Sequence, residues 1–386
     1  MSMRGLRFIS LRRGLMGDVG ELSKLSEACR TDGFFYLVDH GVPRETFART
    51  FSAANRFFTS PGRVKEPTHW SQSKVYPFKV PNRGWVGTLE ERLGPYTGSS
   101  LEQKEAYDWA YDLPALGKKT PFQGPNSWPD LPSGEFRGPL EDFRDSLTVV
   151  ARHVLSMFCS VRGMEPTALD EEFSDPTLIC RILNYPAKLE DYTGCNPHTD
   201  NGWFTLLAQD DQGGLQARLG DGDQWVDVAP QLLSDNALVV NIGDALSAHT
   251  KGEWRSTLHK VIPPATGHRT SAALFFDPNA SSRVFSYCRD MNEAVKVLMH
   301  KAGYRDSFDD LQAMRDLTFA AYKERVFTKF LPEEVLYEDF TDSMKVQTAQ
   351  LIVPFSSLCV VNSSVLRTHM PVAAFHDAWP FPDAHL

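Results

Sequence analysis

The sequence predicts a mostly β protein with flanking helices, folded as a sandwich or double-sheet jelly roll, with an N-terminal α/β region. In residues 177–278 short apolar runs alternate with turn residues, a pattern typical of antiparallel β architectures. Before and after this segment, apolar residues recur at helical spacing. The 26 glycines and 25 prolines among 386 residues suit a loop-rich β protein and are too few for a low-complexity chain.

The composition is that of an ordinary globular chain. Apolar residues make up 42% and charged residues 23%, which argues against a disordered or fibrous protein. The 49 acidic and 40 basic residues leave a net charge of −9, so no attraction to nucleic acid or to an anionic membrane is expected. No repeat or flexible linker interrupts the chain, and its helical and β parts are expected to pack together.

The N-terminal third mixes helices and strands. An opening strand is expected at residues 6–11, followed by a helix at residues 20–30. The aromatic and β-branched run Phe34–Val38 predicts a buried strand that ends at a turn containing Gly41. Pro43 then opens a second helix, because phenylalanines and alanines follow at helical spacing.

The rest of the chain divides into three parts. Residues 65–139 are interrupted by glycine and proline and predict short strands and long loops. A long helix is expected at residues 140–162, because apolar residues recur every three or four positions until Gly163. Helical periodicity returns at residues 308–327. The clearest strands of the β segment are residues 178–185, 204–209, 215–219, 225–228, 237–242 and 271–276.

The cysteine pattern predicts a cytoplasmic protein. The six cysteines are scattered without a CxxC pair, which fits neither a zinc site nor a disulfide framework. The C-terminal tripeptide weakly matches a peroxisomal signal, which is the alternative location, and the arginine-rich start leaves a transit peptide open. The uncharged stretch at residues 346–366 contains Pro354 and several polar side chains, so no transmembrane helix is expected.

Three residues form a candidate metal site. His198 and Asp200 stand two positions apart, so both point to one face if they lie at a strand end. His259, after 58 intervening residues, is the candidate third ligand. Two imidazoles and one carboxylate on one face of an octahedron hold Fe(II) and leave three positions open for substrate and O2. A His-x-Asp pair also arises by chance in a chain with 11 histidines, so the ligand set needs further support.

That support comes from Arg269 and Ser271, at the start of a predicted strand. An arginine in a barrel interior needs an anionic partner, and a carboxylate accepts two hydrogen bonds from its planar guanidinium. Ser271 lies on the same face of the strand and adds a hydroxyl donor to the same carboxylate. The segment after His259 therefore predicts an anion-binding site beside the metal.

The ordered set His198-x-Asp200, His259 and Arg269-x-Ser271 resembles the signature of the Fe(II)- and 2-oxoglutarate-dependent oxygenases, within the group that includes isopenicillin N synthase and the plant flavonoid and gibberellin oxidases. Further similar stretches, within about residues 6–330, are residues 33–42, 83–85, 104–108, 124–129, 184–186 and 243–244. The resemblance implies a distorted double-stranded β-helix. It predicts a dioxygenase-like N-terminal region at residues 1–135, a jelly-roll core with helices at residues 136–335, and a C-terminal extension of unknown role at residues 336–386.

The resemblance also implies roles for individual residues. The residues assigned to Fe(II) are His198, Asp200 and His259. The residues assigned to the distal carboxylate of the cosubstrate 2-oxoglutarate are Arg269, Ser271 and Tyr185, the last through a hydrogen bond. Leu183 departs from the family, because many relatives carry an asparagine there, and the 2-oxo acid end is therefore expected to be held differently.

The implied activity is the oxidation of a small organic molecule by O2, Fe(II) and 2-oxoglutarate. Hydroxylation is the default outcome, desaturation and ring formation are variants, and a specialised metabolite is the expected substrate. Two alternatives stay open: an iron oxidase of the isopenicillin N synthase type that needs no 2-oxoglutarate, and a non-catalytic metal-binding jelly roll. The aromatic residues that are candidates for the wall of the substrate pocket are Trp85, Tyr107, Trp203 and Phe276, although aromatic residues near a barrel mouth usually belong to the core, which is the favoured interpretation.

Overall fold

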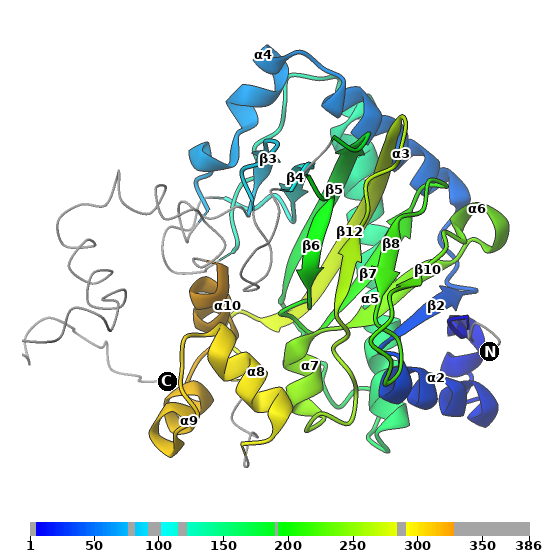
Figure 1. The fold of residues 1–386 in the computed structure, drawn as a ribbon, viewed down its shortest axis with the longest axis vertical. Helices are drawn as coiled ribbons and strands as arrows, with labels where there is room; N and C mark the ends of the chain where they lie inside the picture. Colours follow the sequence, from blue (N-terminus) through cyan, green and yellow to red (C-terminus); the bar gives the residue numbers. More distant parts are fainter. Residues whose placement is uncertain are drawn as a thin grey trace, which may run out of the picture. The chain divides into compact units, whose positions relative to one another are not determined.

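The computed structural model describes residues 5–75, 82–91, 102–114, 122–189, 192–283 and 291–327, all within one compact unit. Their strands form two sheets, with helices against the larger sheet and at one end of the structure (Figure 1). No helix of these residues is long and apolar enough to cross a membrane. The uncharged stretch at residues 346–366 and the predicted extension at residues 336–386 lie outside the described residues.

The larger sheet has eight strands in the order β1-β2-β10-β7-β12-β5-β4-β3. Its strands are β1 Phe8–Ser10, β2 Phe34–Val38, β3 Gly84–Val86, β4 Glu105–Trp109, β5 Pro176–Pro186, β7 Phe204–Gln209, β10 Leu238–Ile242 and β12 His268–Asn279. Strand β2 pairs in parallel with β1 and antiparallel with β10, so the N-terminal third completes the sheet. Strand β2 has the predicted bounds, and it ends before Asp39 and Gly41, whose φ values of 55° and 80° lie outside the β region.

The smaller sheet has four strands in the order β6-β11-β8-β9. Its strands are β6 Cys195–His198, β8 Leu215–Ala217, β9 Val226–Asp227 and β11 His259–Val261. Two glycines next to the smaller sheet lie close to side chains of the larger sheet. If Gly194 carried a Cβ, that atom would lie 3.1 Å from the Tyr185 ring, and a Cβ at Gly214 would lie 3.8 Å from Arg269 Cδ. The two facing sheets form the predicted jelly roll.

Helices from the first half of the chain pack against the larger sheet. These helices are α1 Leu11–Leu15, α2 Val19–Thr31, α3 Arg44–Phe58 and α5 Arg137–Val161. The long helix α5 contacts the other three and β12, and it runs behind the sheet in Figure 1. Phe158 of α5 meets the rings of Phe35 in β2 and Phe204 in β7 edge-on, at centroid distances of 6.5 and 5.4 Å. These aromatic contacts join the helical layer to the sheet.

A second group of helices lies at one end of the sheets, near the lower end of β12 in Figure 1. These helices are α7 Asp244–His249, α8 Glu293–Lys301, α9 Phe308–Arg315 and α10 Phe319–Phe327. Helix α8 packs against α7 and α9, and α10 contacts β12. The remaining short elements are α4 Gly62–Lys65, α6 Leu232–Asp235, η1 Glu66–Thr68, η2 Trp70–Gln72 and η4 Ser133–Glu135.

The predicted elements are present with shifted ends. The opening strand stops at Ser10 because Leu11 already begins α1, and β12 extends at both ends beyond the predicted residues 271–276. Strands β6 and β11 and helices α7 and α8 were not predicted. The four cysteines in the described residues are free and buried.

Phe35 tests the place of β2 in the core, because its side chain is completely buried. Phe35→Ala should lower the free energy of unfolding by about 3–5 kcal/mol, since a packed interior does not refill the space of a phenyl ring. Phe308→Ala is the matched control, because Phe308 is 67% exposed and its loss should cost less than about 0.5 kcal/mol. Urea unfolding of both variants measures the difference, and equal losses would place β2 outside the core.

Candidate metal centre

The smaller sheet brings two histidines together. His198 ends β6, His259 begins β11, and the two are direct partners across the antiparallel pair. The Nδ1 atom of each ring donates to a backbone carbonyl, that of Asn196 at 2.8 Å for His198 and that of Thr257 at 3.0 Å for His259. These bonds orient both rings and leave each Nε2 as the electron-pair donor.

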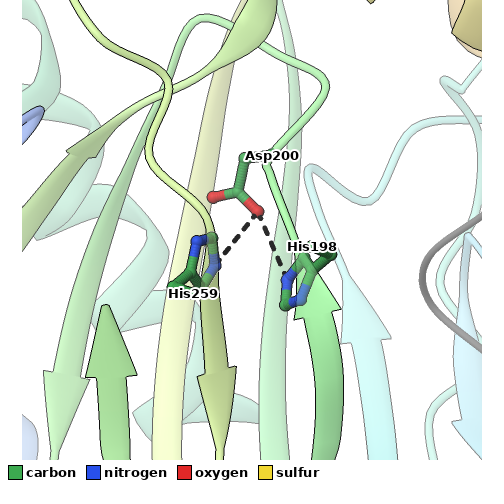
Figure 2. Close-up of side chains that lie close together, drawn as sticks. All are labelled: His198, Asp200 and His259. Atoms are coloured by element: carbon green, nitrogen blue, oxygen red, sulfur yellow. Dashed lines mark ion pairs between the residues drawn. The ribbon is translucent and has the colours of Figure 1, made fainter. Parts of the chain in front are cut away.

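Asp200 faces both histidines from the turn after β6 (Figure 2). Its Oδ1 lies 3.8 Å from His198 Nε2 and 3.7 Å from His259 Nε2. Its other oxygen, Oδ2, accepts hydrogen bonds from the Asn241 amide at 2.7 Å and from the Thr205 hydroxyl. Because Oδ2 is held in this way, Oδ1 is the oxygen that the site presents to an ion.

The protonation states suit metal binding. Burial, and after it the neighbouring His259, lower the pKa of His198 to about 3. Burial acts to raise the pKa of Asp200, but the two histidines and the hydrogen bonds from Thr205 and Asn241 outweigh it, so the net shift is downward. At neutral pH His198 is therefore an unprotonated donor and Asp200 a carboxylate, which are the forms that bind metal.

The three side chains form a compact ligand set. The ligand atoms of His198, Asp200 and His259 lie within 4.8 Å of one another, and within the described residues this is the single such cluster of His, Cys, Asp or Glu. Two nitrogens and one carboxylate oxygen are the donor set of non-haem Fe(II) sites that keep open coordination positions. The residues present therefore fit Fe(II).

Arg269 lies at the start of β12, beside the predicted members of the anion site. It is the direct cross-strand partner of Tyr185 in β5, and its guanidinium lies over the Tyr185 ring at 5.0 Å from the centroid. Its Nη1 donates to Ser271 Oγ at 3.2 Å, and its Nη2 donates to Gln209 Oε1 at 2.8 Å. The structure thus places Arg269, Ser271 and Tyr185 together.

Arg269 forms no ion pair in the described part of the chain, although its charge acts on the carboxylate of Asp210, the neighbour of Gln209. The side chain is 1% exposed, its Nε has no hydrogen-bond acceptor there, and its bonded partners Ser271 and Gln209 are neutral. A buried, uncompensated guanidinium is costly unless a ligand neutralises it. A carboxylate of a bound molecule would supply the counter-charge that Arg269 lacks among its hydrogen-bonded partners.

Comparisons with known proteins agree with this chemistry. Residues 175–278 match the 2OG-Fe(II) oxygenase superfamily, and residues 11–131 match the N-terminal model of the non-haem dioxygenases in morphine synthesis. A 2-oxoglutarate-dependent dioxygenase of Monascus ruber, citB, is 31% identical over 267 residues, which cover 67% of this chain and 78% of the relative. The chain belongs to the 2OG-Fe(II) oxygenase superfamily.

Other relatives of this oxygenase come from fungi and plants. Clavatol oxidase of Penicillium crustosum is 30% identical, over 71% of this chain and 85% of the relative. Homoarginine-6-hydroxylase of Arabidopsis thaliana is 31% identical, over 69% of this chain and 72% of the relative. A structure of JOX2 with 2OG, Fe and JA is 28% identical, with a TM-score of 0.58 over 72% of this chain and 76% of that one. A Neurospora crassa structure with alpha-KG and thymine shares the fold. Its TM-score is 0.61 at 24% identity, and the match covers 73% of this chain and 89% of that one.

This oxygenase is therefore a 2-oxoglutarate-dependent dioxygenase, an oxidoreductase that uses Fe(II), 2-oxoglutarate and O2. The names of its relatives and the intact ligand set favour this activity over both alternatives that the sequence left open, the oxidase that needs no 2-oxoglutarate and the non-catalytic jelly roll.

The oxygenase has a cavity of about 530 Å³ beside the metal ligands, and His198 and Asp200 form part of its wall. Strands β5, β7 and β12 supply one side of the cavity, and helices α8 and α10 supply another. Its apolar lining includes Ile179, Phe204, Phe275, Val297, Val326 and Phe327. A small molecule in this cavity would lie directly against the metal site.

The four aromatic candidates for the pocket wall do not line this cavity, and the core positions that the sequence favoured for them are confirmed for Tyr107, Trp203 and Phe276. Tyr107, Trp203 and Phe276 are fully buried core side chains, and Trp85 is half-buried on β3. Phe275 lines the cavity instead, because consecutive residues of β12 point to opposite faces of the sheet.

Sequence reasoning also missed the residues that orient the ligands. Asn241 and Thr205 hold Asp200, and Gln209 holds Arg269. Asn241 gave a usable signal, since it is the single polar residue of the fully buried strand Leu238–Ile242, and a buried amide needs a polar partner. Thr205 and Gln209 gave no such signal, because threonine is common in strands and Gln209 stands at a strand end.

The metal site predicts the effect of removing one ligand. His198→Ala, Asp200→Ala and His259→Ala should each nearly abolish iron binding and turnover while the fold is retained, because three ligands act as one unit. His268→Ala is the control, since His268 is an exposed residue at the start of β12. Iron content and succinate formation are measured in all four variants. Normal turnover in His259→Ala would exclude this ligand set.

Proposed function

We propose that this oxygenase binds Fe(II) through His198, Asp200 and His259 and binds 2-oxoglutarate through Arg269, and that it oxidises a small organic molecule without net charge in the adjacent cavity. Hydroxylation is the default reaction, and a specialised metabolite is the proposed substrate. Relatives named for clavatol and for homoarginine support a small-molecule substrate.

The buried, unpaired Arg269 is the observation that carries this proposal. Arg269 lies against the backbone at Gly214, next to Leu215, which pairs with Val261 of β11. His259 stands two residues before Val261 on that strand, and two residues of a strand span roughly 7 Å. These neighbour relations support a five-carbon dicarboxylate with one carboxylate on Arg269 and its other end at the metal ligands.

Ser271 and Tyr185 complete the proposed anion site. Ser271 Oγ accepts a hydrogen bond from Arg269, so its own proton is available for an oxygen of the ligand. The Tyr185 ring supports the face of the guanidinium, which keeps the planar fork oriented toward a carboxylate. The hydrogen bond from the Tyr185 hydroxyl to the ligand and the effect of Leu183 on the 2-oxo acid end stay predictions.

When bound, iron and 2-oxoglutarate together activate O2 for the oxidation of a C–H bond, with succinate and CO2 as coproducts. The residues of the chain supply the geometry of this reaction. Thr205 and Asn241 keep the Asp200 carboxylate turned toward the histidines. The apolar wall that includes Phe275 and Phe327 excludes water and holds the substrate against the metal face.

The charges of the cavity wall indicate the class of substrate. In the described residues its three lysine and arginine side chains each have carboxylate partners: Arg181 has Glu91 and Asp108, Lys301 has Asp244, and Lys323 has Asp277. A substrate carboxylate would have to displace one of these internal partners, which is unfavourable in a buried site. The cosubstrate is therefore recognised as an anion, and the substrate mainly through apolar contacts.

Arg269→Lys tests the cosubstrate site. One point charge replaces a two-pronged donor, so the apparent affinity for 2-oxoglutarate should fall roughly ten- to a hundredfold, which corresponds to about 1.5–3 kcal/mol. Arg255→Lys is the control, because Arg255 forms an exposed pair with Asp221. Succinate release is measured against 2-oxoglutarate concentration. Substrate oxidation that proceeds fully without 2-oxoglutarate would contradict the proposal.

The paired charges of the cavity predict substrate selectivity. In a panel of aromatic compounds matched in size, with and without one carboxylate, uncharged members should stimulate succinate release and carboxylates should not. Asp277→Asn leaves Lys323 without its carboxylate partner and is expected to admit the carboxylates. Equal stimulation by charged and uncharged members in the unmodified protein would show that the paired cations do not select the substrate.

A further inference from the structure

Lys301, the last residue of α8, reaches the turn that carries two metal ligands. Its Nζ donates to the Thr199 hydroxyl at 2.7 Å and to the Thr199 carbonyl at 3.1 Å, and it forms an ion pair with the Asp244 carboxylate. Thr199 stands between His198 and Asp200. A side chain 102 positions away in the sequence thus holds the residue that links the two ligands.

Asp244 strengthens the same connection. This residue opens α7, and its backbone amide donates to the Asp200 carbonyl at 2.8 Å. Its carboxylate also accepts a hydrogen bond from the Thr199 hydroxyl at 3.2 Å. The backbone of the ligand turn is therefore held at Thr199 by Lys301 and at Asp200 by Asp244, and these two holding groups are bound to each other.

The ion pair is not needed to attach α8 to the rest of the molecule. Val295, Leu298 and Met299 of this helix are at most 1% exposed and belong to the main hydrophobic core. The burial of these three apolar side chains by itself attaches the helix to the core. The contacts of Lys301 with the turn therefore call for a role other than docking the helix.

Helix α8 also forms part of the substrate cavity. Val297 and Lys301 both line it, together with His198, Thr199 and Asp200 of the ligand turn. The helix lies outside both segments that match family models, residues 11–131 and 175–278. The match to those models thus assigns no role to Lys301.

We propose that Lys301 is a positioning residue, which holds the Thr199 turn so that His198 and Asp200 converge on the metal. This inference rests on the proposed ligand set. Without the lysine the turn loses two hydrogen bonds and the Asp244 carboxylate loses its cation, so the directions of the two ligands are less restricted. Groups that orient metal ligands typically change metal affinity ten- to a hundredfold when removed.

The test is a titration of the full-length protein with Co(II), followed by calorimetry and by the ligand-field absorption of the bound ion. Lys301→Met should weaken Co(II) binding roughly tenfold and alter the absorption spectrum. Lys301→Arg should restore both, because a guanidinium can still donate to Thr199 and pair with Asp244. Lys296→Met is the matched control, since Lys296 lies on the same helix and pairs with the exposed Glu293, and it should leave both readouts unchanged.

A second variant separates weaker metal binding from a loss of stability in Lys301→Met. Asp244 is 2% exposed, so the Lys301→Met/Asp244→Asn double variant removes the cation without leaving a buried, unpaired carboxylate. It should bind Co(II) as weakly as Lys301→Met while it melts close to the unmodified protein. Co(II) affinity and absorption equal to those of the unmodified protein in both variants would overturn the inference. Normal Co(II) binding by His259→Ala would contradict the proposed ligand set, and this result is distinct from one that contradicts the role of Lys301.

Discussion

The site depends on the way in which a single carboxylate is held. Asn241 and Thr205, direct partners across the β10–β7 pair, both donate to Oδ2 of Asp200. The other oxygen is then directed at two histidines from the smaller sheet. The metal centre is thus assembled across both sheets, and its geometry follows from the strand register of each. Residues locked by such hydrogen bonds keep ligands in place without the ion.

Buried charge divides the interior into two kinds of surface. Around Arg269 the bonded partners are neutral, and its charge is left for a ligand to compensate. Around the cavity, in the part of the chain that the structure describes, lysine and arginine are already matched by carboxylates. The proposed function rests on this division, because a buried charge needs a counter-charge: it assigns the anionic cosubstrate to Arg269 and an uncharged substrate to the cavity.

The sequence predicted those parts of the molecule whose signals are local. Short apolar runs located β5 and β7, helical periodicity located α5, and the spaced motif singled out three residues that the structure brings together. Strands β6 and β11 escaped detection, because they are four and three residues long and end or begin with a ligand instead of continuing an apolar pattern. Helix α8 did carry a local signal, since Val295, Leu298 and Met299 stand at helical spacing, but its nine residues are a short window for that period. The contact of Lys301 with Thr199 joins residues far apart in the chain, and only tertiary packing creates it.

The most direct test of the account is the position of the bound metal. A crystal of the protein soaked anaerobically with Fe(II), with diffraction recorded at the iron absorption edge, gives an anomalous peak at each iron. We expect one strong peak within bonding distance of His198 Nε2, Asp200 Oδ1 and His259 Nε2, with Asp200 Oδ2 still hydrogen-bonded to Asn241 and Thr205. A peak at any other set of side chains, or iron bound through Asp200 Oδ2, would contradict the account.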